Sequence, residues 1–273
     1  MELQKLRVDV GDGVAQVILA NPDRRNAMDG AFFNEIRSAF ESLGRDPAVR
    51  AVVLAAEGPH FSAGLDLDWA GAKFGGEGGD PGRRREHLLR TIRDMQAAFD
   101  AIESCRAPVI AAIQGKCIGG GVDLIAACDL RVASADAAFL IAEIDLAITA
   151  DLGTLQRLPH LMPAGIVREL ALTGRPMPAA EAERWGLVNR IEDDAEAARA
   201  SARELAQRIA AKSPLAVSGT KYVLNRSRGR PIEDGLALAG LWNSAMMLGA
   251  DGVETMAARA ARREPAFPPL LKD

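Results

Sequence analysis

Two short apolar runs constrain the fold of this chain more than any other feature. Residues 48–58 read AVRAVVLAAEG and residues 107–113 read APVIAAI. Because the first run is rich in β-branched residues and does not alternate with polar ones, it is typical of a strand that is covered on both faces. The second run predicts another strand. Together they predict a buried sheet.

Helices are predicted between these strands. Residues 29–43 have apolar side chains at helical spacing after Asp29, a residue type that caps helices. Residues 86–104 show a longer amphipathic pattern, and the glycine-rich stretch 75–85 before them is the only flexible-looking insertion. Residues 6–19 alternate around Gly-Asp-Gly, which predicts a hairpin. The alternation of strands and helices along the chain predicts an α/β fold.

The last third of the chain has a different pattern. From about residue 163 it is mostly helical, apart from the strand-like 186–192, GLVNRIE. We divide the chain into a core, residues 1–198, and a C-terminal helical region, residues 199–273. Helices predicted near 199–226 and 231–263 carry more apolar surface than a small layer needs, which favours burial against another subunit.

Composition excludes several classes of function. The formal net charge is -4 and the pI is about 5.6, so we expect no surface built for nucleic acid. Cys105, Cys117 and Cys128 lie in apolar stretches without metal-ligand spacing, which predicts buried free thiols in a reducing compartment. The longest apolar stretch, 107–128, is broken by charges and glycines, so we expect no membrane span. With no visible targeting segment, we expect a cytoplasmic protein.

Two glycine-containing loops follow predicted strands. Residues 117–129, CIGGGVDLIAACD, place three glycines before an apolar helix, where bare backbone N–H groups can approach a ligand. A packing turn is the alternative interpretation. Residues 60–69, HFSAGLDLDW, also follow a buried strand. Two such loops could each direct one N–H at the same oxygen, which is the arrangement of an oxyanion hole.

The segments FSAGLDL, PVIAAIQGKCIGGGVDLIAACD and GTLQRLP together resemble the crotonase superfamily, the enoyl-CoA hydratases and isomerases. The resemblance runs from NPDRRNAMDG to KSPLAVSGTK, most of the chain. It implies a spiral of β-β-α turns, a C-terminal helical trimerisation region, and a homotrimer or dimer of trimers. It also implies an acyl-CoA substrate, with the thioester oxygen bound by the backbone N–H groups of Leu65 and Gly120. The implied CoA- or substrate-binding residues are Arg25, Asn26, Ala63, Gly64, Asp66, Gly119 and Lys221.

Members of this superfamily differ mainly in which acidic residues line the pocket. Hydratases use two glutamates, whereas this chain has Asp123 and Glu143 at those positions and a third acid, Asp151, eight residues further on. This set closely resembles the 3,5-dienoyl-CoA to 2,4-dienoyl-CoA isomerases of fatty-acid β-oxidation. The resemblance implies two proton-transfer acids, with Asp123 in support. We assign Glu143 to carbon 2, because the equivalent glutamate of hydratases works beside the thioester, and Asp151 to carbon 6; the reverse assignment is the alternative. Clustered acids should shift one another's pKa values.

Alternatives stay open at this point. The chain could be an enoyl-CoA hydratase with an unusual first acid, or a non-catalytic acyl-CoA-binding or RNA-binding homologue. Asp151 alone could be a helix N-cap. Deprotonation beside a thioester needs only acids, bases and an oxyanion hole, so we expect no metal and no cofactor besides the CoA of the substrate. Residues expected to be structural, loop or surface residues are Asp129, Asp145, His60, His87, His160 and Arg83 to Arg85, while Trp69 and Phe74 could line an acyl tunnel.

Overall fold

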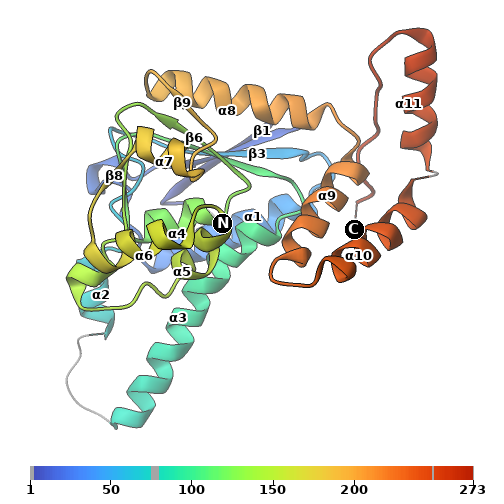
Figure 1. The fold of residues 1–273 in the computed structure, drawn as a ribbon. Coiled ribbons are helices and arrows are strands. Elements are labelled where there is room, and N and C mark those ends of the chain that lie inside the picture. Colours follow the sequence, from blue (N-terminus) through green and yellow to red (C-terminus); the bar gives the residue numbers. More distant parts are fainter. Residues whose placement is uncertain (1–2, 75–79, 248, 273) are drawn as a thin grey trace.

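The computed structural model describes residues 3–74, 80–247 and 249–272 (Figure 1). Its main sheet has the strand order β1-β2-β3-β4-β6-β9, in which β1 and β2 form an antiparallel hairpin and the other neighbours are parallel. A smaller sheet has the order β5-β7-β8. The strands are β1 Leu6–Gly11, β2 Val14–Leu19, β3 Ala51–Ala56, β4 Val109–Ile113, β5 Lys116–Ile118, β6 Leu130–Ser134, β7 Ala138–Leu140, β8 Met177–Pro178 and β9 Arg190–Glu192.

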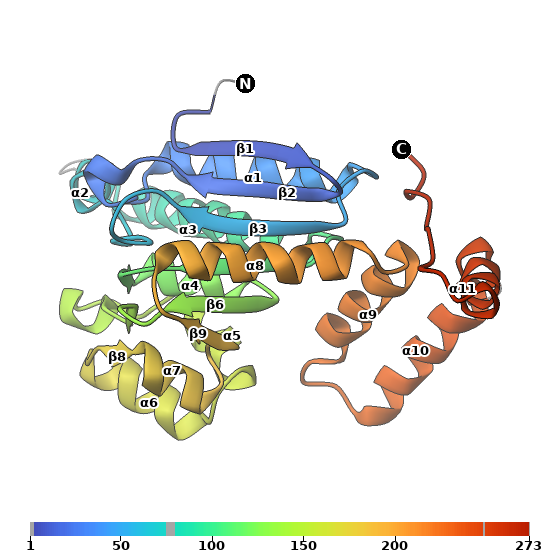
Figure 2. The same cartoon turned by 90° about the horizontal axis from the view of Figure 1, so that it is seen from above.

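Strand β3 is the predicted buried strand, and it is apolar throughout because both of its faces are covered. All six of its residues are buried, and they alternate between two separate apolar clusters. Val52 and Leu54 face the cluster that contains α1 (Gly30–Arg45) and α3 (Pro81–Ser104). Ala51, Val53 and Ala55 face the alanines of α8 (Ala195–Ala210). Figure 2 shows α8 lying across one face of the sheet, with α1 and α3 on the other. The predicted α/β layering is confirmed.

The predicted N-terminal helix is confirmed, and the second one begins earlier than expected. Asp29 caps α1 by accepting the N–H of Phe32. Helix α3 begins at Pro81 rather than near residue 86, because Asp80 accepts the N–H of Arg83 and Pro81 occupies the first turn. Residues 81–85 of the expected flexible insertion are therefore helical. Its residues 75–79 lie outside the described residues.

The domain boundary predicted at residue 198 falls inside α8, whose alanines pack on the main sheet. The predicted helix 199–226 is in fact two helices, since Ser213 caps a new one that begins with Pro214. The helices beyond this break lie together at one end of the molecule (Figures 1 and 2). They are α9 Pro214–Ser227, α10 Ile232–Met246 and α11 Ala250–Ala261.

The remaining helical elements are short, and most of them lie between residues 120 and 185. Among the residues described, no helix is long and apolar enough to cross a membrane. The three cysteines are buried and free, as predicted, and burial raises the pKa of Cys128 to about 12. The remaining elements are η1 Pro22–Arg24, α2 Leu67–Phe74, α4 Gly120–Ala126, η2 Glu143–Leu146, α5 Thr154–Arg157, η3 Leu158–His160, α6 Ala164–Thr173 and α7 Ala179–Trp185.

Candidate active site

Backbone hydrogen bonds hold the two predicted glycine loops side by side. Ser62 and Cys117 form a parallel β-bridge, in which the N–H of Ser62 donates to Lys116 at 3.1 Å and the N–H of Ile118 donates to Ser62 at 3.0 Å. The Ser62 hydroxyl donates to the carbonyl of Asn26 and accepts the N–H of Gly64. These bonds fix the loop that begins at His60 against the start of α4.

The contact between the loops explains two of the glycines. Gly64 has φ +79°, and a Cβ there would lie 2.5 Å from the carbonyl oxygen of Ile118. A Cβ on Gly120 would lie 3.0 Å from the Met28 sulfur and 3.8 Å from the Leu65 nitrogen. Within the described ranges, neither the Leu65 N–H nor the Gly120 N–H has a backbone hydrogen-bond partner in a turn, loop or cap. Both donors are therefore free to bind one oxygen between the loops.

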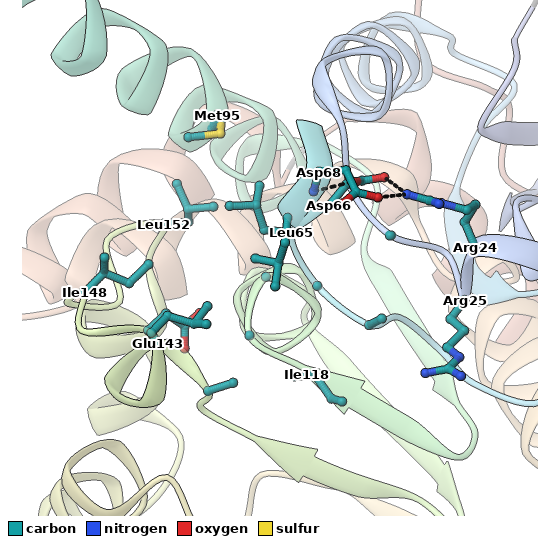
Figure 3. A pocket seen from close by; sticks show the side chains of 18 of the residues that line it. Arg24, Arg25, Leu65, Asp66, Asp68, Met95, Ile118, Glu143, Ile148 and Leu152 are labelled. Atoms are coloured by element: carbon teal, nitrogen blue, oxygen red, sulfur yellow. Dashed lines mark hydrogen bonds and ion pairs between the residues drawn. The ribbon is translucent and has the colours of Figure 1, made fainter. Parts of the chain in front are cut away.

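A cavity of about 600 Å³ opens at this junction (Figure 3). Arg24 and Arg25 lie on one side of the view, Glu143 and Ile148 on the other, and Leu65 lies between them. The cavity brings together nine of the predicted site residues, namely Arg25, Ala63, Gly64, Leu65, Asp66, Gly119, Gly120, Glu143 and Asp151.

The arginine side of the cavity includes a residue that the sequence analysis missed. The Arg24 guanidinium donates to Asp66 at 3.1 Å and to Asp68 at 2.9 Å. Asp66 also accepts the N–H groups of Trp69 and Asp68, and the bond from Trp69 together with Arg24 holds the pKa of Asp66 below its ordinary value. The adjacent Arg24-Arg25 pair in the sequence was the available signal, because two neighbouring cations suit a phosphate-bearing ligand.

Two predicted CoA-binding residues do not line this cavity. The Asn26 side chain is 2% exposed, and its amide donates to the carbonyls of Glu57 and His60, so it closes a turn. The Lys221 ammonium is buried and donates to Asp129 at 2.7 Å. Asp129 also accepts the N–H of Val109 at 2.7 Å, which confirms its predicted structural pairing. Asn26 and Lys221 are therefore structural, because their polar atoms are already bound to the protein.

The aromatic residues suggested for the acyl tunnel also pack elsewhere. Trp69 contacts Phe33 and Phe74, with ring centroids 6.3 and 5.6 Å apart. Neither Trp69 nor Phe74 lines the cavity. Its apolar wall consists mainly of Phe33, Leu65, Met95, Leu146, Ile148 and Leu152.

Asp123 lies behind the cavity rather than in it. Its side chain is 1% exposed, and Oδ1 accepts the N–H of Thr154 at 2.6 Å. Burial raises the pKa of Asp123 to about 7, hydrogen bonding from Thr154 opposes this, and the nearby charges of Glu143 and Asp151 add to it. Asp123 therefore provides the hydrogen bond at the start of α5 that the sequence suggested as an alternative role for Asp151. The N-cap position itself is Gly153.

Glu143 lies on the cavity wall with an unsatisfied oxygen. Its Oε2 is buried without a hydrogen-bond partner among the described residues. A Cβ on Gly119 would come within 3.1 Å of Oε1, so this glycine allows the carboxylate to approach the loop that precedes α4. Burial raises the pKa of Glu143, and the charge of Asp151 raises it further. A carboxylate in this state accepts a proton more readily than an ordinary one.

Asp151 is held through its backbone rather than its side chain. Its carbonyl accepts a 2.6 Å bond from the Gln96 amide on α3, and partial burial raises the pKa of its carboxyl group. The next carbonyl, that of Leu152, accepts from Arg157. The Arg157 guanidinium is buried and also donates to Asp100 and Glu103 on α3. Gln96 and Arg157 were not predicted from the sequence, because only the fold brings α3 beside the Asp151 segment.

The arrangement combines two free backbone donors with two carboxyl groups of raised pKa on one partly apolar cavity. It can stabilise negative charge on an oxygen and move protons beside it. Asp145 also lines the cavity, whereas His60, His87 and His160 do not, and His60 instead accepts the N–H of Lys116. Within the part of the chain that the structure describes, no three metal-binding side chains gather into a cluster.

Comparisons with known proteins identify the family of the chain. The family model described as enoyl-CoA hydratase/isomerase matches residues 9–267. The chain is 45% identical to the peroxisomal Delta(3,5)-Delta(2,4)-dienoyl-CoA isomerase of Arabidopsis thaliana, over 98% of this chain and 97% of the relative. It is 42% identical to the mitochondrial protein of that name from Homo sapiens, over 92% and 77%. A crystal structure of an enoyl-CoA hydratase from Bacillus anthracis superimposes with a TM-score of 0.88 at 28% identity, covering 97% of this chain and 99% of that one. The chain belongs to the enoyl-CoA hydratase/isomerase family.

Proposed function

We propose that this enzyme isomerises 3,5-dienoyl-CoA to 2,4-dienoyl-CoA in fatty-acid β-oxidation. The observation that carries the proposal is the pair of acids, Glu143 and Asp151, on one cavity that also has two free backbone donors. Relatives named as dienoyl-CoA isomerases, 40 to 45% identical over most of the chain, support the same conclusion.

The first step takes a proton from carbon 2 of the substrate. Ionised Glu143 accepts this proton, and the electron pair left on the substrate is delocalised onto the thioester oxygen. The N–H groups of Leu65 and Gly120 form the oxyanion hole that binds this oxygen, and such a donor contributes about 10²- to 10³-fold to a rate. Because both donors belong to the backbone, they are already in place before charge develops.

The second step adds a proton at carbon 6. The extended enolate carries electron density to this carbon, and protonated Asp151 donates to it. Carbons 2 and 6 are too far apart for one short side chain to serve both, so two acids at different points of the cavity suit the reaction. Burial raises the pKa of both carboxyl groups, which favours the protonated form of each relative to an exposed acid.

Substitution of Asp151 tests the proposal. The conjugated 2,4-dienoyl thioester absorbs in the ultraviolet, so its appearance measures isomerisation directly. We expect wild type to be active and Asp151→Asn to lose about 10²- to 10⁴-fold, the usual contribution of a general acid. Crotonyl-CoA hydration is measured in parallel. Robust hydration without isomerisation in the wild type would instead identify the chain as a hydratase.

Acids and backbone donors are sufficient for this chemistry, so we propose that it needs no cofactor beyond the CoA of the substrate and no metal.

We further propose a homotrimer or dimer of trimers, assembled through the C-terminal helices. Light scattering of the purified protein gives its mass and tests this assembly. The apolar residues that α10 and α11 leave exposed include Leu236, Leu241, Val253 and Met256.

The cellular location is open to a direct test. We propose that the enzyme works in the cytoplasm, although the similar isomerases are named as peroxisomal or mitochondrial. Imaging of the tagged protein in its own cells would distinguish these locations.

A further inference from the structure

A second cavity, of about 430 Å³, lies on the other side of the Asp151 segment. Asp151 and Leu152 line both this cavity and the substrate cavity, so they form the wall between the two. We call it the rear cavity. In contrast to the apolar wall of the substrate cavity, its lining is mostly polar and charged, and it includes Gln96, Asp100, Glu103, Gln156, Arg157 and His160.

A two-acid isomerase has to be reset after every turnover. During the reaction a C–H bond at carbon 2 breaks and its proton joins Glu143, while the O–H bond of Asp151 breaks and its proton joins carbon 6. The product leaves with the same number of protons as the substrate. The enzyme is left with a protonated Glu143 and an ionised Asp151, the reverse of its starting state. One proton must leave Glu143 and one must reach Asp151.

We propose that Asp151 regains its proton from solvent through the rear cavity, with His160 on the cavity wall assisting the exchange. Glu143 releases its own proton to water through the substrate cavity once product has left. The proposal rests on the proposed function, since only a reaction that uses two acids requires this reset.

The charges around Asp151 are compatible with repeated loss and gain of a proton. Within the described ranges, Asp151 makes no ion pair, because the nearby Arg157 is already engaged by Asp100 and Glu103 on α3. Ionisation of Asp151 therefore breaks no salt bridge and forms none. The titratable or charged groups on the elements packed around Asp151 are Asp123 and Glu143 on the substrate side, and Asp100, Glu103, Arg157, His160 and Arg228 on the rear side.

His160 is suited to pass protons to this cavity. It is exposed and lies at the end of η3, within the lining of the rear cavity. A neutral imidazole has one donor and one acceptor nitrogen, so it can take up a proton on one side and release one on the other. Asp123 is a less suitable proton carrier for Asp151, because it is buried and its Oδ1 already accepts the Thr154 N–H.

Isotope labelling separates exchange with solvent from an internal return of the proton. The substrate carries deuterium at carbon 2 and the reaction runs in ordinary water over many turnovers. If solvent resets Asp151, mass spectrometry finds no deuterium at carbon 6 of the product. Deuterium at carbon 6 would mean that the proton on Glu143 returns to Asp151 inside the enzyme, which overturns the proposal.

Filling the rear cavity then tests the route. Gln156 is exposed on its wall, and Gln156→Trp adds bulk there. In stopped-flow measurements we expect a burst of one product per active site at the wild-type rate, followed by a steady state that is about tenfold slower, because the reset becomes limiting. Gln207→Trp, on the exposed face of α8, is the matched control. The proposal is overturned if the steady-state rate of Gln156→Trp equals that of wild type, or if its burst rate falls by the same factor as its steady-state rate.

A second variant is independent of how well Gln156→Trp folds. His160→Ala should also keep the burst and lower the steady-state rate by about tenfold, and imidazole buffer should restore much of this loss. A steady-state rate equal to that of wild type would remove His160 from the route. Failure of the proposed function is distinguishable, because the wild type would then show no isomerisation at all.

Discussion

The two halves of the active site are built in different ways. The backbone half, residues 60–66 and 118–120, contributes N–H groups whose position depends on glycines and on the β-bridge between Ser62 and Cys117. The carboxylate half, residues 143–151 with Asp123 behind it, contributes side chains on short elements. In the proposed reaction the backbone half binds the enolate oxygen, whereas the carboxylate half determines where protons leave and arrive. Chemistry can therefore change in the second half while the first stays the same.

The largest effect is expected from breaking the backbone half. In Gly64→Ala the new Cβ would lie 2.5 Å from the Ile118 oxygen, at a φ of +79° that alanine rarely adopts. The loops must then separate and both oxyanion donors move. We expect kcat for isomerisation to fall by about 10⁴-fold, the product of two donors at about 10² each.

Gly71→Ala is the matched control for this variant. Gly71 lies on α2, and a Cβ there would meet nothing within 4 Å. Its kcat should equal that of wild type, and both variants should unfold cooperatively. If Gly64→Ala kept full activity, the Leu65 and Gly120 donors would have no part in the reaction.

Glu143→Gln should have the next largest effect, because it removes the base and leaves the backbone half intact. We expect kcat to fall by about 10³-fold. Exchange of the carbon 2 protons with deuterated water, measured by mass spectrometry, should disappear as well. Asp145→Asn changes another carboxylate of the same cavity and should retain exchange. Exchange at the wild-type rate in Glu143→Gln would assign carbon 2 to a different base.

The sequence predicted the backbone half better than the carboxylate half. Glycine loops after buried strands are local patterns, and both loops are where the sequence placed them. Outside both halves, Asn26 and Lys221 do not line the cavity, and only the fold shows that the Asn26 amide closes a turn and that the Lys221 ammonium is paired with Asp129. Asp123, and not Asp151, accepts the hydrogen bond at the start of α5, and this contact joins residues 31 positions apart.

The fold itself was predicted where patterns are local. The strands and the first helix follow from periodicity and capping. The boundary predicted at residue 198 lies within α8, because the alanines of this helix give the same sequence pattern whether they face a sheet or another subunit. Gln96 and Arg157 could not be predicted, because their contacts join distant parts of the sequence. Gln96 on α3 donates to the carbonyl of Asp151, and Arg157 forms a salt bridge with Asp100 on α3.

Asp123 joins the two halves, and its pKa gives a stability prediction. Burial raises this pKa from 3.8 to about 7, so between these values the folded chain keeps a proton that the unfolded chain has released. Stability therefore falls as pH rises through this window. Asp123→Asn keeps Oδ1 for the Thr154 N–H and cannot ionise.

We expect the stability of Asp123→Asn relative to wild type to increase by roughly 2 to 3 kcal/mol from pH 5 to pH 8. Thermal melting of both proteins across this range measures the difference. Asp9→Asn, at an exposed position on β1, should follow the wild type. A constant difference in Tm would mean that Asp123 titrates alike in the folded and unfolded chains.

The smallest effect concerns how α3 positions the carboxylate half. Gln96→Ala removes the 2.6 Å bond to the Asp151 carbonyl while the Arg157 bond to Leu152 remains. Loss of one such bond is worth about 1 kcal/mol, so we expect kcat for isomerisation to fall about fivefold. Exchange at carbon 2 should be unchanged, because Glu143 is not attached to α3. Arg93→Ala, exposed on the same helix, controls for changes in the helix itself. An equal loss of exchange and isomerisation would show that α3 supports the whole cavity rather than Asp151, and the two halves would then not be separable.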